Sequence, residues 1–140
     1  MAPDTAMIDH HTALIYTMVL VSAADQDMSD AELGKIGEMV TYLPVFKDYD
    51  HNELTSAAED CAELLTKDDG FEAALDLILA GLPEKLRETA YVLACDIAAA
   101  DGKASNEELA LVELIGARLE IEPLAAAAIE RAARARHASV

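Results

Sequence analysis

Six carboxylates in two short segments, residues 25–32 and 101–108, are candidate metal ligands. They are Asp25, Asp27, Glu32, Asp101, Glu107 and Glu108. Carboxylate oxygens are the ligands that hard divalent cations prefer in proteins. Asp30 in the first segment, and Asp96 one helical turn before the second segment, are further candidate oxygen ligands. The residue types do not distinguish Ca²⁺, Mg²⁺, Mn²⁺ and Zn²⁺, so the predicted cofactor is a divalent metal cation.

The two acidic segments are copies of one motif. Residues 23–33 read AADQDMSDAEL, and residues 99–109, which lie 76 positions later, read AADGKASNEEL. Six of these eleven positions are identical, and the similarity continues after the motif at the apolar pairs Ile36/Val112, Met39/Ile115 and Leu43/Leu119. Each copy lies where one predicted helix ends and the next begins. The sequence therefore predicts an internal two-fold repeat of helical hairpins, with copies at about residues 8–43 and 84–119.

Each copy also contains the pattern Ser-x-x-Glu, which is typical of a helix capping box. The serine, Ser29 or Ser105, would accept the N–H three residues later, and the glutamate would reach back to the N–H of the serine. Capping alone explains the glutamates, so the alternative function is a metal-free protein–protein interaction module whose acidic motifs only cap helices. Capping does not explain Asp25 and Asp101, because the helix dipole disfavours a carboxylate near a helix C-terminus.

Known enzymatic and calcium-binding patterns do not fit the chain. Counted from Asp25, an EF-hand loop would need Gly at the position of Asp30 and Glu at the position of Ile36. The copy that starts at Asp101 departs at the same two positions. The E-x-x-H spacing of ferritin-like metal sites, a nucleophile elbow and a Gly-rich phosphate loop are all missing from the sequence. We therefore predict that the protein is not an enzyme.

The elements that position these segments are predicted to be helices, because apolar residues recur with a helical period through almost the whole chain. The expected helices span about residues 8–24, 33–43, 50–65, 71–82, 83–97, 109–119 and 123–136. Asp50 with Glu53 is expected to cap the third helix, and Pro83 to occupy the first position of the fifth. The predicted fold is an all-α compact bundle of about seven helices, forming a single domain over residues 1–140.

Composition limits the partners and the location of the protein. The chain has 27 acidic and 10 basic residues, a formal net charge of −17, and no basic stripe, which argues against nucleic acid as a partner. No apolar run approaches the length of a membrane span, and the N-terminus does not read as a signal peptide, so we expect a cytoplasmic protein. Hydrophobic residues make up 53% of the chain and aromatic residues only 4%, which predicts an aliphatic, alanine-rich core.

The remaining residues with chemical potential have structural explanations. Cys61 and Cys95 lie in apolar helical patterns and are expected to be buried small hydrophobic side chains. His10, His11 and His51 are expected to be solvated residues at helix starts, although the first two are the best nitrogen ligands should the cation be a transition metal. Eight acidic residues between positions 48 and 69 predict a solvated face, with an acidic docking surface for a basic partner as the alternative.

The segment from Ala99 to Leu109, with its copy at residues 23–33, resembles the motif of the TerB-like tellurite-resistance family. That family also resembles the N-terminal domain of a membrane-anchored co-chaperone, and the resemblance covers about residues 8–136. It implies an all-helical fold with a duplicated motif whose acidic positions bind metal; the matching residues are Asp25, Glu32, Asp101 and Glu108. The first copy departs from the family pattern, because Gln26 stands where the family usually has Gly.

The same resemblance carries expectations about the biological setting of the chain. It implies a role in a tellurite, metal or envelope stress response, and association with other proteins of a stress-resistance complex. Association with the membrane is then expected to be peripheral and to occur through those partner proteins. No established enzymatic activity accompanies the resemblance.

Overall fold

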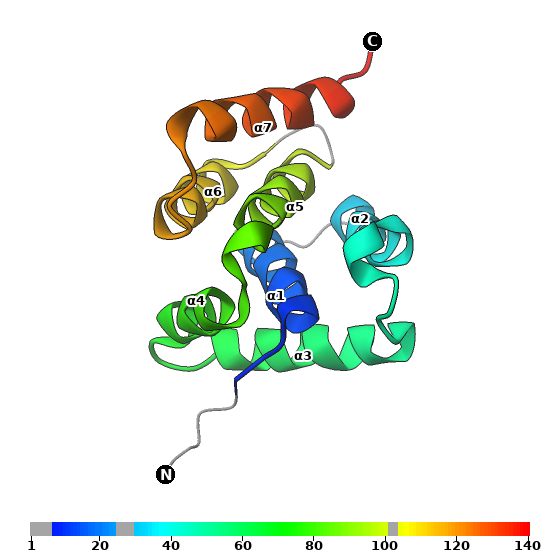
Figure 1. Cartoon of the computed structure of the whole chain (residues 1–140), viewed down its shortest axis with the longest axis vertical. Coiled ribbons are helices and arrows are strands. Elements are labelled where there is room, and N and C mark those ends of the chain that lie inside the picture. The colour runs from blue at the N-terminus through cyan, green and yellow to red at the C-terminus, as the bar shows by residue number, and fades with distance from the viewer. Residues whose placement is uncertain (1–6, 25–29, 101–103) are drawn as a thin grey trace.

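The structure is a computed structural model that describes residues 7–24, 30–100 and 104–140. These residues contain seven α-helices and no β-strand, which confirms the predicted all-α bundle (Figure 1). The helices are α1 (His10–Ser22), α2 (Asp30–Tyr42), α3 (Leu54–Leu65), α4 (Gly70–Gly81), α5 (Arg87–Ala99), α6 (Asn106–Arg118) and α7 (Pro123–Arg136). Short 3₁₀ turns at Pro44–Phe46, His51–Glu53 and Glu84–Leu86 connect some of them. None of the helices in the described ranges is long and apolar enough to cross a membrane.

Helix α1 lies in the middle of the bundle. It contacts α2, α3, α4, α5 and α6, and Figure 1 shows α3 and α7 lying at opposite ends of the molecule. Every residue from Ala13 to Ser22 is buried, so this helix is covered on all its sides. A helix that meets neighbours on all sides must be apolar on all sides. Thr17 is tolerated there because its Oγ1 donates a hydrogen bond to the Ala13 carbonyl at 2.8 Å.

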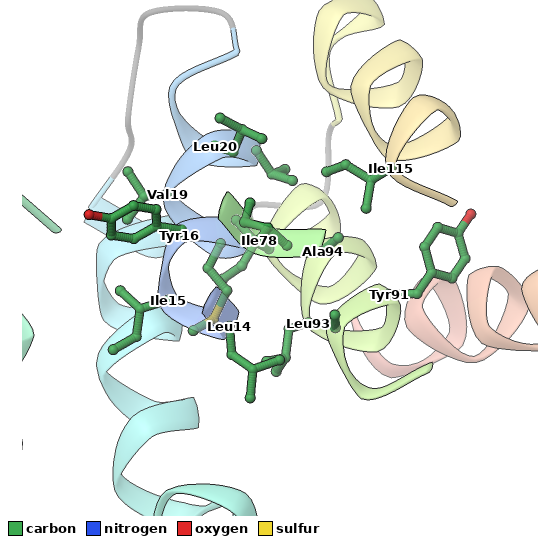
Figure 2. Close-up of a cluster of buried hydrophobic side chains, with 14 of the residues drawn as sticks. Leu14, Ile15, Tyr16, Val19, Leu20, Ile78, Tyr91, Leu93, Ala94 and Ile115 are labelled. Atoms are coloured by element: carbon green, nitrogen blue, oxygen red, sulfur yellow. The ribbon is translucent and has the colours of Figure 1, made fainter. Parts of the chain in front are cut away.

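The core is aliphatic, as the composition predicts. Figure 2 shows side chains of α1 meeting those of α4, α5 and α6, and the labelled aliphatic residues among them are Leu14, Ile15, Val19, Leu20, Ile78, Leu93, Ala94 and Ile115. Tyr91 and Phe46 are the largest fully buried side chains. Both cysteines are buried, which confirms their interpretation as core residues.

Two predicted helix starts are wrong. Asp50 caps the 3₁₀ turn before α3 by accepting a hydrogen bond from the Asn52 N–H at 3.0 Å, so that it forms no capping box with Glu53. Pro83 has an extended backbone (ψ 152°) and precedes the 3₁₀ turn that leads into α5. In both cases the residues that were predicted to begin an α-helix begin a 3₁₀ turn that leads into the helix, because 3₁₀ turns are frequent at the N-terminal ends of α-helices.

Substitution by alanine at two helical glycines is expected to change the stability of the protein in opposite directions. The position of a Cβ on Gly37 in α2 has nothing within 4 Å, whereas a Cβ on Gly116 in α6 would lie 2.8 Å from Tyr91 Cε1. We expect Gly37→Ala to raise the free energy of unfolding by about 0.5–1 kcal/mol, because alanine loses less backbone entropy in a helix. Gly116→Ala should lower it, because the buried ring of Tyr91 must shift. Urea unfolding of both variants checks this, and equal gains at the two positions would contradict the described packing of α6 on α5.

Candidate functional site

The described residues include only half of the predicted metal ligands. Asp25, Asp27 and Asp101 lie outside the described residues. Glu32 lies in the first turn of α2, and Glu107 and Glu108 lie in the first turn of α6. Glu32 and Glu108 are each only 2% exposed, whereas Glu107 is exposed. Glu32 and Glu108, which occupy the same position in the two motif copies, are therefore both buried, whereas Glu107 is exposed to solvent.

The predicted capping box is confirmed at the start of α6. The Glu108 N–H donates to Ser105 Oγ at 3.0 Å, and the Ser105 N–H donates to Glu108 Oε1 at 3.1 Å. At the start of α2, the corresponding serine, Ser29, lies outside the described residues. Because a carboxylate has two acceptor oxygens, a capping hydrogen bond and a metal bond are compatible on one glutamate.

Substitution of the capping serine should show how much the capping box contributes to the free energy of unfolding. We expect Ser105→Ala to lower the free energy of unfolding by about 1 kcal/mol, because the Glu108 N–H loses its acceptor. Ser56→Ala, at an exposed position inside α3, is the matched control and should have little effect. Thermal unfolding of both variants makes the comparison, and an equal change in the two would mean that the cap adds no stability.

The second acidic segment lies beside the end of α1. Glu107 lines a hollow of about 360 Å³ together with Ala23 and Ala24, the two residues that follow the end of α1. Phe71 of α4 and Leu114 of α6 line the same hollow. Residues of both motif copies thus meet at one place, although the copies are far apart in the sequence.

Asp96 has a different role from the one that the sequence suggested. It is 3% exposed, and its Oδ1 accepts a hydrogen bond from Arg136 Nη2 and lies 3.4 Å from His137 Nε2. This buried carboxylate therefore holds the end of α7 against α5. No sequence pattern predicts the contact between Asp96 and Arg136, which lie 40 positions apart, because it depends on how α7 packs across the bundle.

The histidines do not form a metal site in the described part of the chain. The prediction that His11 is solvated is wrong: its Nε2 lies 2.9 Å from the Val45 carbonyl, and its ring packs against Phe46 and Tyr49 at centroid distances of 5.7 and 5.2 Å. His51 is exposed, as predicted. Among the described residues, no group of three or more His, Cys, Asp and Glu side chains has the geometry to hold a metal ion.

The other candidate groups behave as solvated or core residues. The eight acidic side chains between positions 48 and 69 are exposed, as predicted for a solvated face; they are Asp48, Asp50, Glu53, Glu59, Asp60, Glu63, Asp68 and Asp69. Burial raises the pKa of the Cys61 and Cys95 thiols to about 12. At neutral pH both thiols are therefore protonated and poor nucleophiles.

Comparison with known proteins identifies the family of the chain. A family model for the tellurite resistance protein TerB matches residues 11–131, which extend from α1 into α7 and include both acidic segments. No curated protein and no solved structure gives a significant match. Since the family model covers most of the helical bundle, the chain belongs to the TerB family of tellurite resistance proteins.

Proposed function

We propose that the chain is a non-enzymatic helical domain that binds a divalent metal cation at its two acidic segments. Membership of the TerB family supports a role related to tellurite resistance. The finer assignment, to cation binding in a tellurite, metal or envelope stress response, rests on the acidic motif and its placement. In this proposal the domain acts in the cytoplasm with other proteins of a stress-resistance complex, and meets the membrane only through them.

The observation that carries the proposal is the inverted burial at the start of α2 and of α6. Glu32 and Glu108 are 2% exposed, whereas the leucines that directly follow them, Leu33 and Leu109, are both 51% exposed. Hydrophobic burial alone would choose the opposite orientation, with leucine inside and glutamate in water. The same inversion at both helix starts supports the proposal that each carboxylate is held inward to bind a cation.

A divalent cation would stabilise a buried carboxylate that lies close to other acidic residues. A buried carboxylate is stabilised by hydrogen bonds, by an opposite charge or by a metal ion. At α6 the cap supplies one hydrogen bond to Glu108, and Asp101 is the further carboxylate that the family motif places nearby in the sequence. A cation bound there would offset the repulsion between these negative charges and would stabilise the folded state.

Calorimetric titration of the metal-free protein tests the proposal. We expect saturable binding of at least one of Ca²⁺, Mg²⁺, Mn²⁺ and Zn²⁺, and its loss in the Asp25→Ala/Asp101→Ala double variant. The Asp48→Ala/Asp68→Ala double variant, which removes the same charge from exposed positions outside the motif, is the control and should bind normally. The absence of binding heat with all four cations, or unchanged binding by the first double variant, would refute the proposal.

The second candidate function is a metal-free interaction module, and the capping box favours it. Both hydrogen bonds of the box are present at Ser105 and Glu108, so the glutamate of that copy already has a structural use. The exposed acidic side chains along α3 would then offer a docking surface to a basic partner. Under this alternative, replacement of either motif glutamate by glutamine leaves every activity unchanged, because glutamine can make the same capping bond.

A further inference from the structure

A cleft of about 520 Å³ opens between the end of α5, the start of α6 and the end of α7. Its apolar lining includes the small side chains of Cys95, Ala98, Val112 and Ala133, and the half-exposed Leu109 forms part of its wall. The volume and the apolar lining are typical of sites that bind small molecules. The described motif glutamates do not line this cleft, although Ala99, Ala104 and Leu109 of the second motif copy do.

The charged groups of the cleft leave one cation without a partner. Glu130 Oε2 accepts a hydrogen bond from the Tyr91 hydroxyl at 2.6 Å. Arg134, one turn later on α7, makes no hydrogen bond or ion pair with any described residue, although it lines the same cleft. Arg87, Arg118 and Arg136 are each paired with a carboxylate, whereas Arg131, exposed and outside the cleft, shares with the exposed Arg134 the lack of a partner among the described residues.

An unpaired guanidinium beside an apolar floor is suited to an anion with an apolar body. The planar guanidinium of arginine matches the geometry of a carboxylate and can donate two parallel hydrogen bonds to it. The chain has 27 acidic residues, and Arg134 nevertheless pairs with none of those that the structure describes. His137, which also lines the cleft and is 13% exposed, adds a ring that can donate a hydrogen bond.

We propose that this cleft binds a small monocarboxylate with an unbranched apolar tail. The tail lies on the floor formed by Ala98, Val112 and Ala133, and the carboxylate pairs with the Arg134 guanidinium at the mouth. Burial of the tail supplies affinity, and the guanidinium selects an anionic head group over a neutral or cationic one. Glu113 and Glu130, the two carboxylates of the lining, repel the ligand and limit its affinity.

Decanoate is the probe that tests this site, with decanol and decyltrimethylammonium as neutral and cationic analogues at concentrations below micelle formation. EDTA is present throughout, so the outcome does not depend on the cation site. Methyl NMR should show saturable binding of decanoate with shifts at Ala98, Leu109 and Val112, and decanol should bind about tenfold more weakly, as expected for the loss of one charge-assisted hydrogen bond. Equal or tighter binding of either analogue would overturn the proposal, as would binding to anionic lipid vesicles without binding of monomeric decanoate.

Variants of the lining separate this cleft from other surfaces. Arg134→Gln should weaken decanoate binding about tenfold, whereas Arg131→Gln, at an exposed position of the same helix outside the cleft, should leave it unchanged. Glu113→Gln should strengthen binding, because it removes a like charge. Ala98→Leu should fill the floor and abolish binding while the circular dichroism spectrum stays helical. Equal losses in the two arginine variants would overturn the proposal, and this comparison holds even where Ala98→Leu fails to fold.

Discussion

Neither cysteine thiol is expected to react with iodoacetamide at pH 8 while the protein is folded, and both should react once it is unfolded. Burial raises the pKa of the Cys61 and Cys95 thiols to about 12, and only the thiolate is nucleophilic. At pH 8 such a thiol is ionised about a thousandfold less than one with an ordinary pKa. Alkylation in the native state should therefore be slower by about that factor.

Mass spectrometry of the alkylated protein, sampled over time with and without denaturant, makes this measurement. A small free thiol added to the same sample is the control for reagent activity. Labelling of either cysteine in the native protein at the rate of the free thiol would contradict the described burial. It would also weaken the proposal that the domain is not an enzyme, because an ionised thiol could take part in redox chemistry.

The Glu108→Gln variant is expected to lose at least about tenfold in cation affinity with little change in stability. Glutamine keeps an oxygen that can accept the Ser105 N–H, but it removes the negative charge that attracts a divalent cation. Ser105→Ala should show the reverse, with a loss of about 1 kcal/mol in the free energy of unfolding and a smaller change in affinity. Calorimetry and urea unfolding of the same samples give both quantities.

The matched control for this comparison is Glu59→Gln, which removes one charge from an exposed position of α3. Its cation affinity should equal that of the unaltered protein. If Glu108→Gln also bound cations normally, the glutamates would only cap helices, and the metal-free interaction module would be the better proposal.

The helical period of the sequence predicted most of the fold. It identified all seven helices, and the seventh has the predicted limits, because Pro123 favours the first position of a helix and the alanine-rich stretch continues to Arg136. The central place of α1 was not predicted. A pattern of apolar residues shows which side of a helix avoids water, but it does not show how many neighbours will cover the helix. The internal two-fold repeat of helical hairpins stays a prediction.

The candidate site was predicted in part. The Ser-x-x-Glu spacing correctly predicted the hydrogen bonds at the start of α6, because a capping box involves only residues close in sequence. The exposure of Leu33 and Leu109 beside buried glutamates could not be predicted, since it depends on how α2 and α6 are turned about their axes when they pack. The partners of Asp96 and the cleft lined by Arg134 likewise arise from the packing of α7.

A cation at the acidic segments can be located directly by anomalous X-ray scattering from a crystal soaked in Mn²⁺. The proposal predicts an anomalous peak beside the first turn of α6, with carboxylate oxygens of Asp101 and Glu108 among its ligands. A peak at the start of α2, beside Glu32, is expected for the other copy of the motif. A map with no peak at either helix start, from crystals soaked at saturating Mn²⁺, would contradict the proposed cation site.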